Sequence, residues 1–397
     1  MNILLISPHY PQRLYHFAMA FKARGFNLVG IGDTPYHQLN DELKASLSDY
    51  VQHDLSCYAS SGVIDPARYE PLYRTVAYLV SKHGRFDAIE SLNEYWLPLE
   101  AQLRLDFNTP GPKPEELAHL VRKSLMKAHF QEAGALVVPG EVLLDQAQLE
   151  RFFATHQDIV VKPDVGVGAS DTRRLRTAAE VDQFWREKNP NVTYFIEKFV
   201  HAEDRELISF DGIADKDGEL VFFCEHSYCA GIMEVVGGMP LTYFNYKNAE
   251  IPPKLMELGI ATVKSFGLRK RFFHIEYFRI GDDYYGLEIN ARPPGVLTLD
   301  LMNHAKAIDV WALFAAVMGG EKPKPQFGRD WTCAYNGRLE RLPYRHQHHE
   351  IMATYGEFIG HFMPMDSPVM GDFAYVVVAP SHEKRREVMD FINALHD

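Results

Sequence analysis

The sequence lacks most of the features that mark secreted and membrane-spanning proteins. Its four cysteines, Cys57, Cys224, Cys229 and Cys333, form no CxxC pair and have no zinc-ligand spacing, which predicts reduced thiols in a cytoplasmic protein. No apolar run approaches the ~18 residues of a membrane span. The start, MNILLISPHY, has neither the basic region nor the small-residue cleavage site of a signal peptide.

Positive charge is also scarce. The sequence has 41 Lys and Arg residues and 53 Asp and Glu residues, and the formal charge of −12 argues against nucleic acid or anionic lipid as the main partner. There is no internal repeat, no low-complexity tract and no GxxxxGK[ST] phosphate-binding loop. The 397 residues are 46% hydrophobic and 24% charged, which is typical of a globular protein with two or three domains.

The order of the predicted elements divides the chain into three parts. Residues 1–114 open with strand, helix and strand and end in a proline-rich segment, NTPGPKPEE, which predicts an N-terminal open parallel-sheet, Rossmann-like α/β domain. Residues 115–323 predict an α+β domain in which about residues 130–200 form a smaller half, the lid. Residues 324–397 follow two closely spaced prolines and predict a small C-terminal appended unit.

Residues 272–295, FFHIEYFRIGDDYYGLEINARPPG, predict a β-hairpin with a three-residue loop at 281–283. The pairing that this loop implies, Ile280 with Tyr284, places two glutamates directly opposite each other. Residues i and i+2 share a face of a strand. One face therefore carries Glu276, Glu288, Asn290 and Arg292, and the opposite, core face carries Ile275, Tyr277, Leu287 and Ile289.

The two opposed glutamates favour a metal site on this hairpin. Carboxylates directly across a sheet, ~5 Å apart, repel each other and destabilise the pairing. A divalent cation removes that cost, and oxygen ligands from Glu276, Glu288 and Asn290 suit Mg²⁺, which keeps water or phosphate oxygens as its other ligands. The alternation by itself favours an ordinary half-exposed hairpin.

Two lysines suggest phosphate binding. Lys162 ends the predicted strand DIVVKP, and a polar, glycine-containing loop follows at 164–174. An ammonium group beside flexible backbone N–H groups is suited to a phosphate. Lys123 lies on a predicted helix with Lys127 four residues further on, where a solvated helix face is the more common explanation.

In combination, these segments resemble the ATP-grasp superfamily, most of all the carboxylate–amine ligases related to carbamoyl-phosphate synthetase large chains and biotin carboxylase. The resemblance covers about residues 1–320. Its most specific piece is EINARPPG (288–295), and KSLMKAHFQEAGALVVPG (123–140) resembles the lysine-to-PG helix of those enzymes. It implies an N-terminal pre-ATP-grasp domain followed by two α+β halves that close on the nucleotide.

The resemblance also implies a role for each matching residue. It implies that lysines neutralise the ATP phosphates under a closing loop, that a hinge holds adenine, that an acidic residue binds ribose, that Mg²⁺ (or Mn²⁺ in its place) has three ligands, and that an arginine stabilises phosphoryl transfer. The phosphate lysines are Lys123 and Lys162, and the closing loop is 164–171, with Gly166, Gly168 and Ser170. The hinge residues are Glu197, Lys198, Phe199 and Val200, and the ribose ligand is Glu206, with Asp204 and then Glu203 as alternatives. The metal ligands are Glu276, Glu288 and Asn290, and the transfer arginine is Arg292.

The implied activity is that of an ATP- and Mg²⁺-dependent ligase. A substrate carboxylate becomes an acyl phosphate, an amine displaces the phosphate, and ADP and phosphate are released. Amino acids or small peptides are the first expectation for the substrates, and a homodimer is the most common oligomeric outcome. Two alternatives are an ATP-grasp carboxylase or carboxylate–thiol ligase, and a nucleotide-binding regulator without turnover. No biotin-carrier segment is visible, and the intact transfer residues argue against a pure binder.

Three further groups of residues are candidates for other roles. Asn93-Glu94 follow a predicted strand at the edge where open α/β sheets bind ligands, or they cap a helix. Residues 346–350, HQHHE, suggest a metal site or, more commonly, a polar surface. Cys224, Cys229 and His226 suggest a thiol nucleophile, although buried inert cysteine is more common on an apolar strand.

Overall fold

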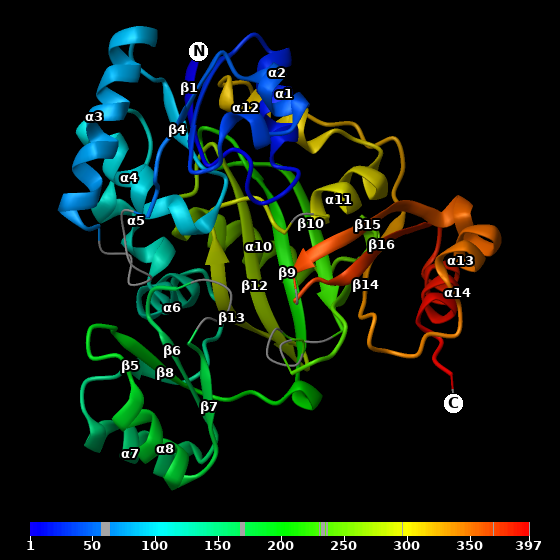
Figure 1. The fold of residues 1–397 in the computed structure, drawn as a ribbon. Helices are drawn as coiled ribbons and strands as arrows, with labels where there is room; N and C mark the ends of the chain where they lie inside the picture. Colours follow the sequence, from blue (N-terminus) through cyan, green and yellow to red (C-terminus); the bar gives the residue numbers. More distant parts are fainter. Residues whose placement is uncertain are drawn as a thin grey trace.

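Three β-sheets organise the part of the chain that the structure describes (Figure 1). The structure is a computed structural model, and it describes residues 1–56, 64–166, 171–229, 231, 235, 237–295, 297–367 and 369–396. A four-stranded parallel sheet lies in the N-terminal part, a four-stranded antiparallel sheet forms the lid, and an eight-stranded antiparallel sheet forms the centre of the molecule. None of the described helices is long and apolar enough to cross a lipid bilayer.

The N-terminal sheet has the strand order β3-β2-β1-β4, and all of its pairs are parallel. Its short strands are buried on both sides, as parallel strands between helices are. This is the predicted open parallel sheet. The elements are β1 (Asn2–Ile6), α1 (Tyr15–Ala23), β2 (Asn27–Gly32), η1 (Tyr36–Gln38), α2 (Asp41–Ser46), β3 (Asp49–Gln52), α3 (Pro66–His83), β4 (Ala88–Glu90), η2 (Glu94–Trp96) and α4 (Leu97–Asp106).

The lid is a separate small sheet with the order β5-β8-β6-β7 and two helices against one face (Figure 1). Its strands alternate: Ile159, Val161 and Ile196 pack into the lid core, so the residues between them point to the opposite face. The elements are β5 (Gly140–Val142), α7 (Gln146–His156), β6 (Ile159–Pro163), β7 (Arg173–Leu175), α8 (Ala178–Glu187) and β8 (Tyr194–Lys198).

The large sheet has the order β13-β12-β9-β10-β11-β14-β16-β15. Its strands are β9 (Glu206–Ala214), β10 (Leu220–Tyr228), β11 (Thr242–Asn245), β12 (Arg271–Ile280), β13 (Asp283–Asn290), β14 (Thr332–Arg338), β15 (Ile359–Ser367) and β16 (Gly371–Ala379). The accompanying helices are α5 (Pro114–Val121), α6 (Lys123–Glu132), η3 (Ala202–Asp204), η4 (Asn248–Glu250), α10 (Pro253–Ser265), α11 (Thr298–Lys306), α12 (Val310–Met318), α13 (His348–Tyr355), η5 (Gly356–Phe358) and α14 (His382–Asn393).

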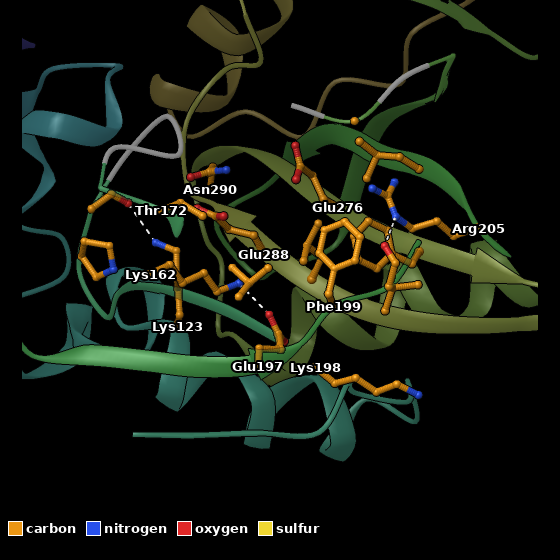
Figure 2. A pocket seen from close by; sticks show the side chains of 18 of the residues that line it. Lys123, Lys162, Thr172, Glu197, Lys198, Phe199, Arg205, Glu276, Glu288 and Asn290 are labelled. Atoms are coloured by element: carbon orange, nitrogen blue, oxygen red, sulfur yellow. Dashed lines mark hydrogen bonds and ion pairs between the residues drawn. The ribbon is translucent and has the colours of Figure 1, made fainter. Parts of the chain in front are cut away.

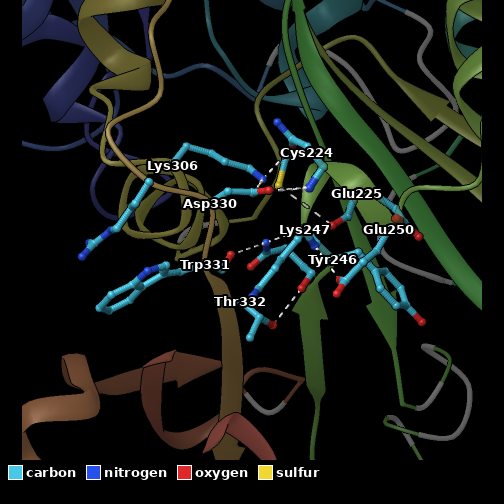
Figure 3. Close-up of polar contacts among 12 residues, drawn as sticks. Cys224, Glu225, Tyr246, Lys247, Glu250, Lys306, Asp330, Trp331 and Thr332 are labelled. Carbon is cyan, nitrogen blue, oxygen red and sulfur yellow. Dashed lines mark hydrogen bonds and ion pairs between the residues drawn. The ribbon is translucent and has the colours of Figure 1, made fainter. Parts of the chain in front are cut away.

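The C-terminal segment, residues 324–397, continues this sheet, because β14 pairs with β11. The start of β14 is held by a buried polar cluster (Figure 3). Lys306, with no exposed side-chain surface, donates to Asn248 Oδ1 (2.6 Å) and forms an ion pair with Asp330. Asn245 donates to the Trp331 carbonyl (3.0 Å). The division of the chain at residues 114 and 323 stays a prediction.

The predicted hairpin is present as β12 and β13, but its turn is tighter than expected. Ile280 pairs with Asp283 and not with Tyr284, so the loop has two residues. A bulge at Leu287 then shifts the register, and Glu276 does lie opposite Glu288. The prediction that Leu287 points into the core is wrong, because the bulge turns it to the same side as the glutamates, where it lines a cavity.

A buried cluster of four charged residues ties the N-terminal sheet to the large sheet. Arg104 donates to Glu90 Oε1 (3.0 Å) and Glu100 Oε2 (2.7 Å), and Arg271 of β12 donates to Glu90 Oε2 (2.6 Å). All four side chains are almost fully buried. Two guanidinium groups balance two carboxylates, so the charges are paired, and Glu90 of β4 is joined to Arg104 of α4 and to Arg271 of β12.

Replacing Arg271 with Met should lower the free energy of unfolding by about 3–5 kcal/mol, because it leaves two buried carboxylates with a single guanidinium group between them. Chemical denaturation measures this loss. Arg74→Met is the matched control, since the Arg74–Glu70 pair (2.9 Å) is exposed on a helix, and its loss should cost at most ~1 kcal/mol. Equal losses in the two variants would show that the buried cluster does not stabilise the junction.

Candidate active site

A cavity of about 320 Å³ lies between the lid and the β12–β13 hairpin (Figure 2). The lid contributes Val160, Lys162, Pro163, Gly166, Thr172, Glu197 and Lys198, and the following segment contributes Phe199, Val200, Arg205 and Leu207. The large sheet and its flanks contribute Glu276, Phe278, Leu287, Glu288, Asn290 and Arg292. Lys123, Glu94 and Gly231 complete the wall. The cavity therefore brings together most of the residues that the sequence pointed to.

Three lysines lie on the lid side of the cavity, and two of them share one carboxylate. Lys162 Nζ donates to Glu197 Oε2 (2.8 Å), and Lys127 forms an ion pair with the other oxygen of Glu197. Lys123 Nζ donates to the Gly166 carbonyl (2.9 Å). The solvated helix face, the more common explanation for such lysines in isolation, does not apply here, since both side chains are buried. The positive charges exceed the negative charge in direct contact, which favours an anionic ligand at this end.

Burial and charge act against each other on these groups. Burial alone would raise the pKa of Glu197, but Lys127 and Lys162 hold it down at about 2. Burial opposes the charge on Lys162, yet Glu197, together with Glu288 and Glu276 across the cavity, keeps the pKa of Lys162 above its ordinary value. For Lys127 burial prevails, and its pKa is lowered in spite of Glu197. Glu197 is therefore ionised and holds Lys162 in the charged form.

The position of Lys123 is fixed by a helix terminus. Asp164, directly after β6, accepts a hydrogen bond from the backbone N–H of Ser124 (2.8 Å) and one from its hydroxyl (3.0 Å). The Lys123 backbone N–H donates to the Asp164 carbonyl (2.9 Å). The carboxylate thus caps the start of α6. This contact places the first residue of α6 beside the end of the strand that carries Lys162.

The hairpin side of the cavity carries the two opposed glutamates and Asn290. Glu276 accepts from His274 Nε2 (3.0 Å). With its amide nitrogen turned toward Glu94, Asn290 donates to both carboxylate oxygens of Glu94 (2.7 and 2.9 Å). In that orientation the amide oxygen, the atom that can ligate a metal, does not face Glu94. Among the described residues, no group of three or more His, Cys, Asp or Glu side chains is arranged to hold a metal, so a cation here needs other oxygen ligands besides two carboxylates.

Arg292 is held at the edge of the cavity by Glu94. Its Nη2 donates to Glu94 Oε2 (3.1 Å), and its Nη1 donates to the Pro293 carbonyl (3.0 Å). The side chain of Arg292 is 22% exposed, so a ligand can reach it. Burial raises the pKa of Glu94, although Arg292 opposes the shift. Asn93 caps the next turn by accepting from the Tyr95 N–H (3.0 Å). The helix-cap interpretation therefore applies to Asn93, whereas Glu94 lines the cavity.

The other end of the cavity is apolar. Phe199, Phe278, Leu207 and Val160 line it. The guanidinium of Arg174 lies 3.7 Å from the centre of the Phe199 ring, which fixes the ring in place. The Phe199 backbone N–H donates to the Asp158 carbonyl (3.0 Å) and is not available to a ligand. Lys198 is exposed at the end of β8, and its side chain points away from the cavity (Figure 2).

Two of the predicted site residues do not reach the cavity. Asp204 is exposed in η3 and does not line it. Glu206 alternates with the lining residues on the strand and accepts from Ser227 Oγ (2.6 Å) on the other side of the sheet. Gly168 and Ser170 lie outside the described residues. The geometry thus gives no support to Asp204 or Glu206 as ligand-binding residues.

A buried chain of polar side chains runs behind Glu276. Asp211 accepts from His274 Nδ1 (2.5 Å) and from His226 Nδ1 (2.6 Å). Burial opposes protonation, but Asp211 raises the pKa of His274 to about 9. Cys224 Sγ lies 3.8 Å from His226 Nε2 and is fully buried, which fits an inert thiol. The sequence pattern did not point to Asp211, because an aspartate on an apolar strand reads as a surface residue.

The C-terminal histidines have structural roles. His346 stacks on Phe391 with 3.7 Å between ring centres, and His348 stacks on Phe362 at 4.0 Å. Glu350 accepts from the Gln347 N–H (2.7 Å) at the start of α13. These contacts agree with the polar-surface interpretation of residues 346–350.

Comparison with known proteins bears on the fold. No protein-family model matches the sequence, and no curated protein sequence matches it. Solved structures do match over almost the whole chain. An L-amino acid ligase from Bacillus licheniformis aligns with a TM-score of 0.70 and 14% identity, covering 100% of this chain and 98% of that one. The chain has the ATP-grasp fold.

Two further structures carry the same ATP-grasp fold. N5-carboxyaminoimidazole synthetase from Staphylococcus aureus matches with a TM-score of 0.70 and 13% identity, over 99% of this chain and 97% of that chain. The biotin carboxylase domain dimer of 2-oxoglutarate carboxylase from Hydrogenobacter thermophilus, solved with MgADP and bicarbonate, matches with a TM-score of 0.69 and 15% identity, over 98% and 89%. The predicted resemblance and fold class are confirmed at the level of the fold.

The lowered pKa of Glu197 makes the free energy of unfolding depend on pH. It falls from an ordinary 4.5 to about 2 in the folded protein, so its ionised form contributes about 3 kcal/mol of stability above pH 4.5, which is lost as the pH falls toward 2. The difference in unfolding free energy between the natural protein and Glu197→Gln should therefore shrink to roughly half or less at pH 3 compared with pH 7.

Denaturation curves across this pH range measure the effect. Glu150→Gln, an exposed change on α7, should give curves parallel to those of the natural protein. If the Glu197→Gln curves are also parallel at every pH, the lysines do not hold this carboxylate ionised.

Proposed function

We propose that this protein is an ATP- and Mg²⁺-dependent ligase that joins a carboxylate to an amine. One observation carries the proposal. The Lys162–Glu197 pair of the lid and the opposed Glu276 and Glu288 of the hairpin face each other across one cavity, with Arg292 at its edge. Cationic groups on one side and paired carboxylates on the other suit a metal-bound polyphosphate.

The two ends of the cavity suit the two ends of ATP. The apolar end, with Phe199 and Phe278, offers rings and aliphatic groups to a nucleobase. The polar end offers Lys123 and Lys162 to the phosphates. Val200, directly after Phe199, also lines the cavity and would contact the base in the hinge. In place of the predicted acidic residue, Arg205 and Leu207 occupy the wall beside the hinge.

Glu276, Glu288 and Asn290 would hold Mg²⁺. The fit rests on the register, which places two carboxylates side by side where they repel unless a cation lies between them. When bound, the ion supplies charge neutralisation for the phosphate oxygens. His274 donates to one oxygen of Glu276 and so orients the carboxylate for its role as a ligand.

The reaction then needs little covalent participation from the protein. A substrate carboxylate oxygen attacks the γ-phosphorus of ATP, the bond to the β–γ bridging oxygen breaks, and ADP leaves. An amine then attacks the carbonyl carbon of the acyl phosphate, the carbon–oxygen bond to phosphate breaks, and the amine loses a proton. Lys162 and Arg292 position the transferred group and neutralise its charge. Positioning and charge neutralisation account for most of the catalysis of phosphoryl transfer.

The experiment that tests this function is a screen for phosphate release. Purified protein with MgATP is given pairs drawn from a panel of amino acids and other carboxylates and amines, and products are identified by mass spectrometry. A ligase releases phosphate only when both partners are present and yields an amide. Release with bicarbonate alone would favour a carboxylase, and nucleotide binding with no release for any pair would favour a regulator without turnover.

Glu288→Gln should lower kcat by ~100-fold or more, because it removes one negative charge from the metal site with little change of shape. The fold should persist, as judged by the melting temperature. Steady-state phosphate release at limiting and saturating Mg²⁺ is the measurement. Glu141→Gln, on the exposed side of β5, is the control and should behave as the natural protein does. Full activity of Glu288→Gln at limiting Mg²⁺ would contradict the assignment.

Arg292→Lys should lower kcat by ~100-fold or more, while the affinity for ATP and the melting temperature change little. A guanidinium donates two parallel hydrogen bonds to phosphate oxygens, which an ammonium cannot reproduce, and charge spreads over those oxygens in the transition state. Steady-state kinetics, nucleotide titration and thermal denaturation measure the three quantities. A surviving kcat with a lowered melting temperature would make Arg292 a structural residue that serves only to hold Glu94.

A further inference from the structure

A second cavity, of about 490 Å³, adjoins the first and is not used by the nucleotide in the proposal above. The two cavities share Glu94, Leu207, Glu276 and Arg292 as lining residues. The shared residues lie where the metal-binding carboxylates and the transfer arginine meet. A molecule in the second cavity can therefore present one end to the phosphate-binding region and extend away from it.

The wall away from this junction is aromatic and aliphatic. Five aromatic side chains line it, namely Tyr10, Tyr95, Tyr228, Tyr243 and Trp311. Packing fixes several of them: Tyr243 stacks on Tyr228 at 4.9 Å and on Tyr335 at 5.0 Å, and Trp311 stacks on His16 at 4.5 Å. Such a wall is preformed and needs little reorganisation to hold an apolar group.

Among the described lining residues, two charged side chains lie in this wall outside the junction, Arg13 and His274, and both are already paired with carboxylates, His274 with Asp211 and Glu276. Arg13 donates to both carboxylate oxygens of Asp300, at 3.1 and 2.5 Å. This bidentate pair engages Nε and Nη2 of Arg13, and its Nη1 lies 3.5 Å from His361 Nε2. A charged substrate side chain would therefore enter this part of the cavity without a partner and lose its water, which is costly.

We propose that the second cavity binds the substrate carboxylate's apolar portion, so that the protein activates organic acids of amino-acid size that carry an aromatic or branched aliphatic side chain. The carboxylate lies at the shared junction beside Arg292, and the side chain lies among Tyr228, Tyr243 and Trp311. This inference rests on the proposed ligase function for the reaction, but the binding preference itself does not depend on turnover.

The test combines binding with trapping of the activated acid. The panel is phenylalanine, 3-phenylpropionate, leucine, aspartate and lysine, and calorimetry with a non-hydrolysable ATP analogue and Mg²⁺ measures the affinity for each. Phenylalanine and 3-phenylpropionate share the ring and the carboxylate, so their comparison shows whether an α-amino group is needed. Hydroxylamine with MgATP replaces the unknown amine: it attacks the acyl phosphate, releases phosphate and leaves a hydroxamate that can be measured.

The apolar acids should bind and form hydroxamate with kcat/KM ~100-fold or more above that of aspartate and lysine. Trp311→Ala should raise the dissociation constant for phenylalanine and 3-phenylpropionate by ~10-fold or more and leave that of the ATP analogue unchanged. Trp331→Ala is the matched control, since Trp331 is half-buried and lines neither cavity, and it should leave both constants unchanged.

Two failures are distinguishable. Equal or tighter binding of aspartate or lysine, or no binding of any apolar acid, overturns the inference about the second cavity whether or not the protein is a ligase. Binding of the apolar acids that is weakened by Trp311→Ala, without phosphate release or hydroxamate, supports the cavity assignment and overturns the ligase function.

Discussion

The proposed chemistry of this protein depends on two carboxylates that face each other across neighbouring strands. Glu276 and Glu288 are direct partners in the β12–β13 ladder, where like charges oppose pairing. Hydrogen bonds among neighbouring side chains fix the position of Glu276. His274 donates to Glu276 and is itself held by Asp211. Two adjacent carboxylates attract a cation, and a cation bound there can in turn bind phosphate oxygens.

The opposite wall carries the complementary charge on a separate sheet. Lys162 and Lys127 share Glu197, and this buried carboxylate raises the pKa of Lys162 although burial opposes its charge. The lid and the hairpin belong to different sheets, so the cavity lies between two units. The second cavity begins where these walls meet at Arg292. One arginine thus borders both the nucleotide region and the region proposed for the acceptor.

The sequence predicted the elements with strong local patterns. The alternation in 272–295 and the glutamate spacing identified the hairpin and the opposed pair, although two errors in the register cancelled: the turn is one residue shorter, and the bulge at Leu287 restores the alignment. Burial of Lys127, the partner of Glu94 and the placement of Glu206 depend on tertiary packing. A single residue that belongs to no periodic pattern gives no indication of its tertiary contacts. The sequence could suggest an acidic ribose ligand only by resemblance, and the strand alternation places Glu206 elsewhere.

The central claim is that a substrate carboxylate takes the γ-phosphoryl group of ATP. The most direct measurement uses an acid labelled with ¹⁸O in both carboxylate oxygens, with MgATP and hydroxylamine, and mass spectrometry of the released phosphate. Because the acyl phosphate cleaves at its carbon–oxygen bond, the account predicts one ¹⁸O atom in each phosphate released during hydroxamate formation. Phosphate that carries no label, released while the labelled acid is consumed, would contradict the account, since the γ-phosphoryl group would then have passed to water.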